Sequence, residues 1–102
     1  MLLVPLALAG DTFAIAENNR TVAYACKPDG VVQVLGNGNS VTLTGPCDAV
    51  SVTGNDNTVH TEMARTITVA GNQNGVSWQR GVGKDPPRVQ NLGNGNKVAR
   101  KQ

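Results

Sequence analysis

The carboxylates and the single histidine are the groups that could carry out acid–base chemistry in this chain of 102 residues. Enzymes that cleave polysaccharides use two carboxylates at a defined separation, but no such pair recurs at a constant spacing here. The seven acids are Asp11, Glu17, Asp29, Asp48, Asp56, Glu62 and Asp85. A nucleophilic mechanism would need a base beside a serine or cysteine, and His60 stands at an outward position of an expected strand. We therefore expect a non-catalytic protein.

Calcium is the metal ion for which the sequence has the most suggestive pattern, a glycine-rich repeat. Glycine-rich nonapeptide repeats bind calcium in β-rolls, and two such repeats span about 18 residues. Those sites depend on recurring aspartates, because calcium takes hard oxygen ligands. Asparagine replaces aspartate almost everywhere in this chain, and Asp56 is the one acid inside a glycine-asparagine unit. We expect no metal and no cofactor, and keep a calcium-stabilised β-roll as an alternative.

The two cysteines, Cys26 and Cys47, are the remaining reactive groups. No Cys-x-x-Cys motif is present, which disfavours a redox-active dithiol. Both lie in segments that return from one repeat to the next, so neighbouring coils would bring them side by side. A disulfide that closes a loop of about 20 residues contributes about 3 kcal/mol on the chain-entropy model, and an even cysteine count suits an exported chain. We predict a Cys26–Cys47 disulfide, with two buried thiols as the alternative.

The elements that must position these groups follow an internal repeat of the form Gly-Asn-x-Asn-x-Val. Its copies begin at Gly36, Gly54, Gly71 and Gly93. Their spacings are 18 (54−36), 17 (71−54) and 22 (93−71) residues. Its asparagines are Asn37, Asn39, Asn55, Asn57, Asn72, Asn74, Asn94 and Asn96. Alternating apolar residues flank most copies, and a weaker copy precedes them with Glu17 in the glycine place. Such a period is typical of stacked coils.

The fold class that this repeat predicts is all-β: a short single-stranded parallel β-helix, or β-solenoid, of about five coils. Period-two alternation predicts a strand on each side of the corner, and glycine and asparagine tolerate the left-handed backbone of a tight turn. Stacked asparagines can form a hydrogen-bonded ladder, which we expect of one asparagine in each pair. Val34, Val52 and Val69 should share one inward column. Right-handed winding is expected from other parallel crossovers.

An antiparallel sheet of hairpins is the alternative fold. Asn37-Gly38 and Asn94-Gly95 lie between alternating apolar residues, which is a strong signal for two-residue hairpin turns. The repeat places the same residue type at the same position of each copy, which a stack of parallel coils needs. Antiparallel pairing does not require this, so the repeat favours the solenoid.

The chain is expected to be one β-solenoid domain over residues 10–102. Residues 1–9 are apolar and end in Ala7-Leu8-Ala9, which is typical of the end of a truncated secretory signal; a segment that caps the first coil is the alternative. They are too few for a transmembrane span of about 20 residues. The formal net charge is +2 with scattered basic residues, which disfavours nucleic-acid binding.

Two surfaces are candidates for binding. Rows of outward hydroxyls could form a flat face of the kind that binds ice or carbohydrate; they come from Thr42, Thr44, Ser51, Thr53, Thr66 and Thr68. The second candidate is the insertion that lengthens the last spacing, since insertions in solenoids map to one face. Its proposed binding residues are Trp78, Arg80, Lys84 and Arg88. Alternatively, Trp78 fills the last inward column. An envelope protein, a carbohydrate, or a second copy bound through the ends or faces would be the partner.

From Phe13 to Arg100 the sequence resembles a family of small exported bacterial proteins that carry a domain of unknown function, numbered thirty-sixty. The likeness rests on Tyr24-Ala25-Cys26, on Gly45-Pro46-Cys47 and on the Gly-Asn-x-Asn-x-Val units. The resemblance implies a repetitive β-fold and a secreted or periplasmic location, and it brings no catalytic residues. We therefore predict a non-catalytic structural or binding module of the bacterial cell envelope.

Overall fold

The alternating segments form eight β-strands in the computed structural model, which describes residues 12–27, 29–83 and 85–100. The strands are β1 (Thr12–Ile15), β2 (Thr21–Ala25), β3 (Gly30–Asn37), β4 (Ser40–Asn55), β5 (Thr58–Asn72), β6 (Gly75–Gly81), β7 (Arg88–Asn94) and β8 (Lys97–Arg100). Each pairs in parallel with the strand one coil away. The expected all-β solenoid of about five coils is confirmed. The segment 1–9, expected to be a signal remnant or a cap, lies outside the described residues.

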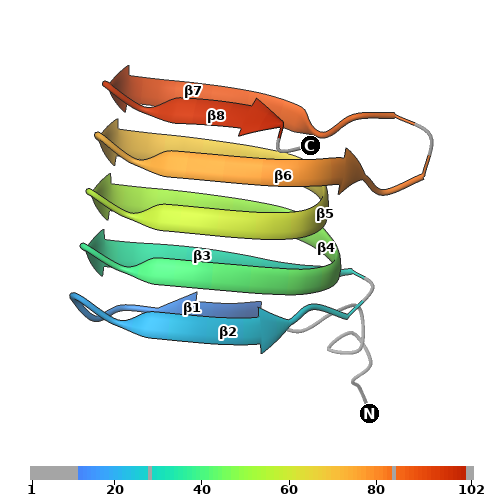
Figure 1. Ribbon diagram of the computed structural model, residues 1–102, viewed down its shortest axis with the longest axis horizontal. Coiled ribbons are helices and arrows are strands. Elements are labelled where there is room, and N and C mark those ends of the chain that lie inside the picture. The colour runs from blue at the N-terminus through green and yellow to red at the C-terminus, as the bar shows by residue number, and fades with distance from the viewer. Residues whose placement is uncertain (1–11, 28, 84, 101–102) are drawn as a thin grey trace, which may run out of the picture.

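The strands form two layers, which face each other across a narrow interior (Figure 1). The front layer contains β2, residues 40–44 of β4, residues 58–62 of β5, β6 and β8. The back layer contains β1, β3, residues 49–55 of β4, residues 66–72 of β5, and β7. The strands on either side of a corner therefore belong to different layers. The hairpin alternative is wrong, because β3 pairs with residues 47–55 of β4 and not with the residues that follow its own corner.

The winding is right-handed, as expected for parallel crossovers. In Figure 1 the chain climbs from β1 and β2 at the bottom to β7 and β8 at the top. The front strands run from left to right and the back strands return from right to left. Each coil therefore advances along the stack with the same sense of turn.

The core is a set of aliphatic columns that run along the stack. Val34, Val52 and Val69 pair in register and are fully buried, which confirms the predicted inward column. A matching column in the front layer contains Val41 and Val59. Small β-branched side chains are sufficient here, because each one packs against its equivalent in the next coil and the stability of the stack accumulates coil by coil.

Glycine begins each corner because the coils approach one another too closely for a side chain. Gly54 has a φ of 132°, and a Cβ atom placed on it would overlap the carbonyl oxygen of Gly36 in the preceding coil. Gly71 and Gly93 occupy the equivalent place above their own preceding glycines. The first coil has Glu17 at this position, and its carboxylate pairs with Arg20 at 2.6 Å. Among the described residues, no further coil lies below this first one.

An inner asparagine ladder, made of Asn39, Asn57, Asn74 and Asn96, fills the interior of the corner. The side-chain oxygen of Asn57 accepts a hydrogen bond from the Asn39 N–H at 3.0 Å, and its amide nitrogen donates to the Gly36 carbonyl at 2.9 Å. Asn74 repeats both bonds one coil later. The ladder thus satisfies backbone groups in a region from which water is excluded.

A second, outer ladder runs along the exposed edge of the same corner. It contains Asn37, Asn55 and Asn72, with Asn94 next in register. The amide of Asn55 donates to the side-chain oxygen of Asn37 at 3.0 Å, and Asn72 donates to Asn55 at 3.1 Å. Both asparagines of the first three pairs therefore take part, whereas the sequence led us to expect one of each pair.

Candidate functional site

A β-bulge on the side opposite the corners interrupts the regular stacking of the front layer. The register of β4 and β5 passes from Leu43 against Thr61 to Pro46 against Met63, so two residues of β4 lie opposite one of β5. The extra residue accounts for the spacing of 18 in that coil and 17 in the next. Bulges re-aim side chains and are frequent beside functional sites.

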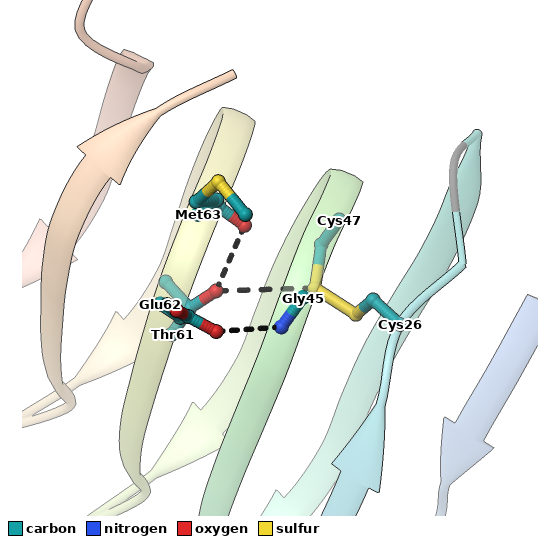
Figure 2. The surroundings of a disulfide bond; sticks show 6 residues. All are labelled: Cys26, Gly45, Cys47, Thr61, Glu62 and Met63. Atoms are coloured by element: carbon teal, nitrogen blue, oxygen red, sulfur yellow. Dashed lines mark hydrogen bonds between the residues drawn. A yellow bond between two sulfur atoms is a disulfide. The ribbon is translucent and has the colours of Figure 1, made fainter.

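At the bulge, the side chain of Glu62 takes the hydrogen bond of the Gly45 N–H. The Oε1 atom of Glu62 accepts from the Gly45 N–H at 2.9 Å (Figure 2). Its second oxygen lies 3.6 Å from the guanidinium of Arg80. Gly45 itself has a φ of 78°, and a Cβ atom there would press on the Cys26 carbonyl. The carboxylate is thus held in one place by backbone and charge.

The predicted disulfide between Cys26 and Cys47 forms directly behind the bulge and is confirmed. Both cysteines are buried, and the Cys26 N–H donates to the Thr44 carbonyl at 2.7 Å. Figure 2 shows Thr61 beside the bridge, with its hydroxyl donating to the Met63 carbonyl at 3.3 Å and lying 3.9 Å from the Cys47 sulfur. Covalent and hydrogen-bonded contacts therefore brace the bulge from the interior.

A groove of about 490 Å³ lies on the outward face of the front layer beside this bulge. Its walls are six polar side chains from three coils: Thr42, Thr44, His60, Glu62, Ser77 and Gln79. Leu43 and Thr61 lie beneath it. We call this hollow the polar groove. It presents hydroxyl, imidazole, carboxylate and carboxamide groups side by side.

His60 and Ser77 form a hydrogen-bonded pair in the polar groove. The Nδ1 atom of His60 bonds to the Ser77 hydroxyl, and the two residues are in register on β5 and β6. From the sequence, His60 was considered alone and Ser77 was missed. The signal was available, because their separation of 17 positions (77−60) equals that of Gly54 and Gly71 (71−54). Glu62, the neighbouring carboxylate, binds Gly45 and Arg80 instead.

Three of the candidate binding residues at the insertion, Trp78, Arg80 and Arg88, line two adjoining hollows. Trp78 lies in the inward column of Leu43 and Thr61 and packs against the core, with the Arg100 guanidinium 5.7 Å from the centre of its ring. Arg80 lines a small hollow with Trp78, whereas Arg88 lines a different one. Lys84 lies outside the described residues. The two hollows share Asp85 and Pro86, and a binding face at the insertion stays a prediction.

The outward hydroxyls are also divided between the layers. Thr42 and Thr44 project from the front layer, where they line the polar groove. The other members of the predicted rows come from the back layer; they are Ser51, Thr53, Thr66 and Thr68. A single flat hydroxyl face across all six is therefore not formed.

The asparagines that replace aspartate in the repeat are engaged in the two ladders. Their side-chain oxygens accept hydrogen bonds from the neighbouring coil, as Asn57 does from Asn39 and Asn37 does from Asn55. Within residues 12–27, 29–83 and 85–100, no three His, Cys, Asp or Glu side chains gather where they could hold one metal ion. Over the same residues, no helix is long and apolar enough to span a membrane.

Comparison with known proteins places the chain in a family. No curated protein and no solved structure matches it. A family model described as "Protein of unknown function (DUF3060)" matches residues 34–95, which is more than half of the chain. The matched segment includes the corners that begin at Gly36, Gly54 and Gly71, Cys47 and the residues of the polar groove. The chain therefore belongs to this DUF3060 family of proteins of unknown function.

Proposed function

We propose that this protein is an exported, non-catalytic binding module of the bacterial cell envelope. The observation that carries the proposal is the buried disulfide between Cys26 and Cys47. Disulfides persist in oxidising compartments such as the periplasm and the extracellular space, and small exported domains use them to compensate for a limited core. This chain has an aliphatic core without a central aromatic cluster, which suits such compensation.

The non-catalytic part of the proposal rests on how the acid and base groups are engaged. Glu62 accepts from a backbone N–H and faces Arg80, while His60 bonds to Ser77. Acid–base hydrolysis of a glycoside needs two carboxylates facing one bond, and the polar groove contains one carboxylate. A rigid surface rich in hydrogen-bonding groups suits recognition better than bond cleavage.

Cell fractionation with thiol trapping tests this proposal. Cells that produce the protein from its own gene are fractionated, and each fraction is unfolded in denaturant that contains a maleimide reagent, so that buried free thiols also gain mass. We expect the protein in the envelope or the medium, with both cysteines unreactive until a reductant is added. The Cys26→Ser variant should carry one reactive thiol and serves as the control for labelling. Recovery of the native protein in the cytosolic fraction with two reactive thiols would overturn the proposal.

A further inference from the structure

We propose that the polar groove binds an uncharged saccharide segment of about two sugar rings, with Ser77 and Gln79 among its direct contacts. This inference deepens the proposed function and rests on its claim that the module binds rather than cleaves. The groove has a volume of about 490 Å³, which lies within the range of about 300 to 1,000 Å³ that is usual for small-molecule sites.

The chemistry of the groove wall matches a sugar hydroxyl, which both donates and accepts hydrogen bonds. Thr42, Thr44 and Ser77 offer hydroxyls of the same dual character, and Gln79 offers an amide donor beside a carbonyl acceptor. A phosphate would be better served by several cations and free N–H groups. The ion pair with Arg80 offsets the charge of Glu62, so the groove favours a neutral ligand.

The spacing of the wall also suits a chain of rings. Thr42, His60 and Ser77 form one column across three coils. Glu62 and Gln79 form a second column two residues further along the strands, and Thr44 lies at the bulge beside it. Successive coils lie about 4.8 Å apart and the two columns about 6.6 Å apart. A ligand lying along the solenoid axis would therefore meet a hydrogen-bonding side chain from each successive coil, at a spacing comparable to the size of a sugar ring.

The groove is held in its binding shape before a ligand arrives. Glu62 is fixed by Gly45 and Arg80, His60 by Ser77, and the bulge by the disulfide behind it. Ordering side chains on binding costs free energy, and a preformed site avoids much of that cost. The six wall residues come from strands rather than from loops, which favours recognition without a conformational change.

Backbone amide NMR of the intact protein tests the site directly. Cellobiose, maltose and N,N′-diacetylchitobiose are the neutral probes, and digalacturonate and inorganic phosphate are the anionic ones. With at least one neutral disaccharide we expect saturable shifts at residues 42–44, 60–62 and 77–79, with a Kd of about 1 mM or tighter. The absence of localised shifts with all three, or tighter binding of an anionic probe, would overturn the inference.

Matched variants on the two layers sharpen the test. Ser77→Ala and Gln79→Ala should each weaken binding about three- to tenfold, as expected for one lost hydrogen bond. Ser51→Ala and Gln90→Ala change outward residues of the back layer and should leave affinity unchanged. If the back-layer variants lost as much affinity as the front-layer variants, the assignment of the site would be contradicted. The amide spectra report whether each variant is folded.

The same experiment separates failure of this inference from failure of the proposed function. An exported, oxidised protein that ignores every neutral disaccharide would remove the saccharide site and leave the envelope role standing. New anomeric signals from cleaved disaccharide, absent from a blank without protein, would remove the non-catalytic claim and would still support binding in the groove.

Discussion

The two narrow sides of the solenoid are built in different ways. The corner side, residues 36–39, 54–57, 71–74 and 93–96, repeats the same glycine and asparagines in every copy. The return side, residues 45–48, 62–65, 81–83 and 85–87, carries a bulge, a disulfide and an insertion instead. Cys47, Ala64 and Gly81 stand in register there, each with a different side chain. The regular side therefore accounts for the stacking of the coils, and the bulge on the irregular side fixes Glu62 at the polar groove.

The largest effect should come from adding a methyl group to the corner side. In Gly54→Ala the Cβ atom would overlap the Gly36 carbonyl oxygen and the backbone would be strained at positive φ, so we expect a loss of about 4 kcal/mol or more in the free energy of unfolding. Gly75→Ala is the matched control, because its Cβ atom would meet nothing within 4 Å; its effect should be within about 0.5 kcal/mol. Urea denaturation followed by circular dichroism measures both, and similar losses would refute the corner geometry.

Removal of the disulfide should have the next largest effect, and it acts on the return side. The double variant Cys26→Ala/Cys47→Ala releases a loop with a sequence separation of 21 and should lower the free energy of unfolding by about 3 kcal/mol. The same denaturation experiment, with and without reductant, measures it. A wild-type protein as stable reduced as oxidised would show that the bridge does not constrain the stack.

The two ladders on the corner side should differ because one is buried and the other is exposed. Asn57→Ala leaves the buried Asn39 N–H and Gly36 carbonyl without their partners and should cost at least about 2 kcal/mol. Asn55→Ala removes an exposed member of the outer ladder, where water can take over the bonds, and should cost less than about 1 kcal/mol. Melting curves of the two variants compare them. A larger loss in Asn55→Ala would contradict the assignment of inner and outer ladders.

The smallest effect should come from the carboxylate at the bulge. Glu62→Gln keeps an oxygen for the Gly45 N–H but removes the charge that faces Arg80, and partly exposed ion pairs contribute about 0 to 1 kcal/mol. We expect almost unchanged global stability together with faster hydrogen exchange at Gly45, measured by NMR. Arg65→Gln breaks the ion pair with Asp48 on the same side and should leave Gly45 unaffected. Unchanged exchange at Gly45 in Glu62→Gln would show that the charge does not fix the bulge.

The parts of the structure that could be predicted from the sequence are those that the repeat encodes. Equal spacing of like residues indicated the stacked columns, and the corner glycines indicated close approach of neighbouring coils. The cysteines could be paired because each lies in a return segment of adjacent copies. The second ladder was missed because a single copy does not show whether an exposed asparagine bonds to its equivalent or to water.

The polar groove could be predicted only in part. His60 and Ser77 are one repeat apart, so their contact follows from the spacing once stacking is assumed. The position of Glu62 depends on which residue of the longer coil bulges out, and the spacings of 18 and 17 do not locate that residue. Trp78 takes the inward alternative given for it, because the register of Leu43, Thr61 and Trp78 follows from the repeat spacing.

Native-state hydrogen exchange of the backbone amides tests the contrast between the two sides most directly. The Asn39, Asn57 and Asn74 N–H groups donate to the inner ladder and should exchange only through global unfolding, at the slowest rates in the protein. The Gly45 N–H, which depends on Glu62, should exchange faster, through local opening. Corner amides that exchange as fast as Gly45 would contradict the account.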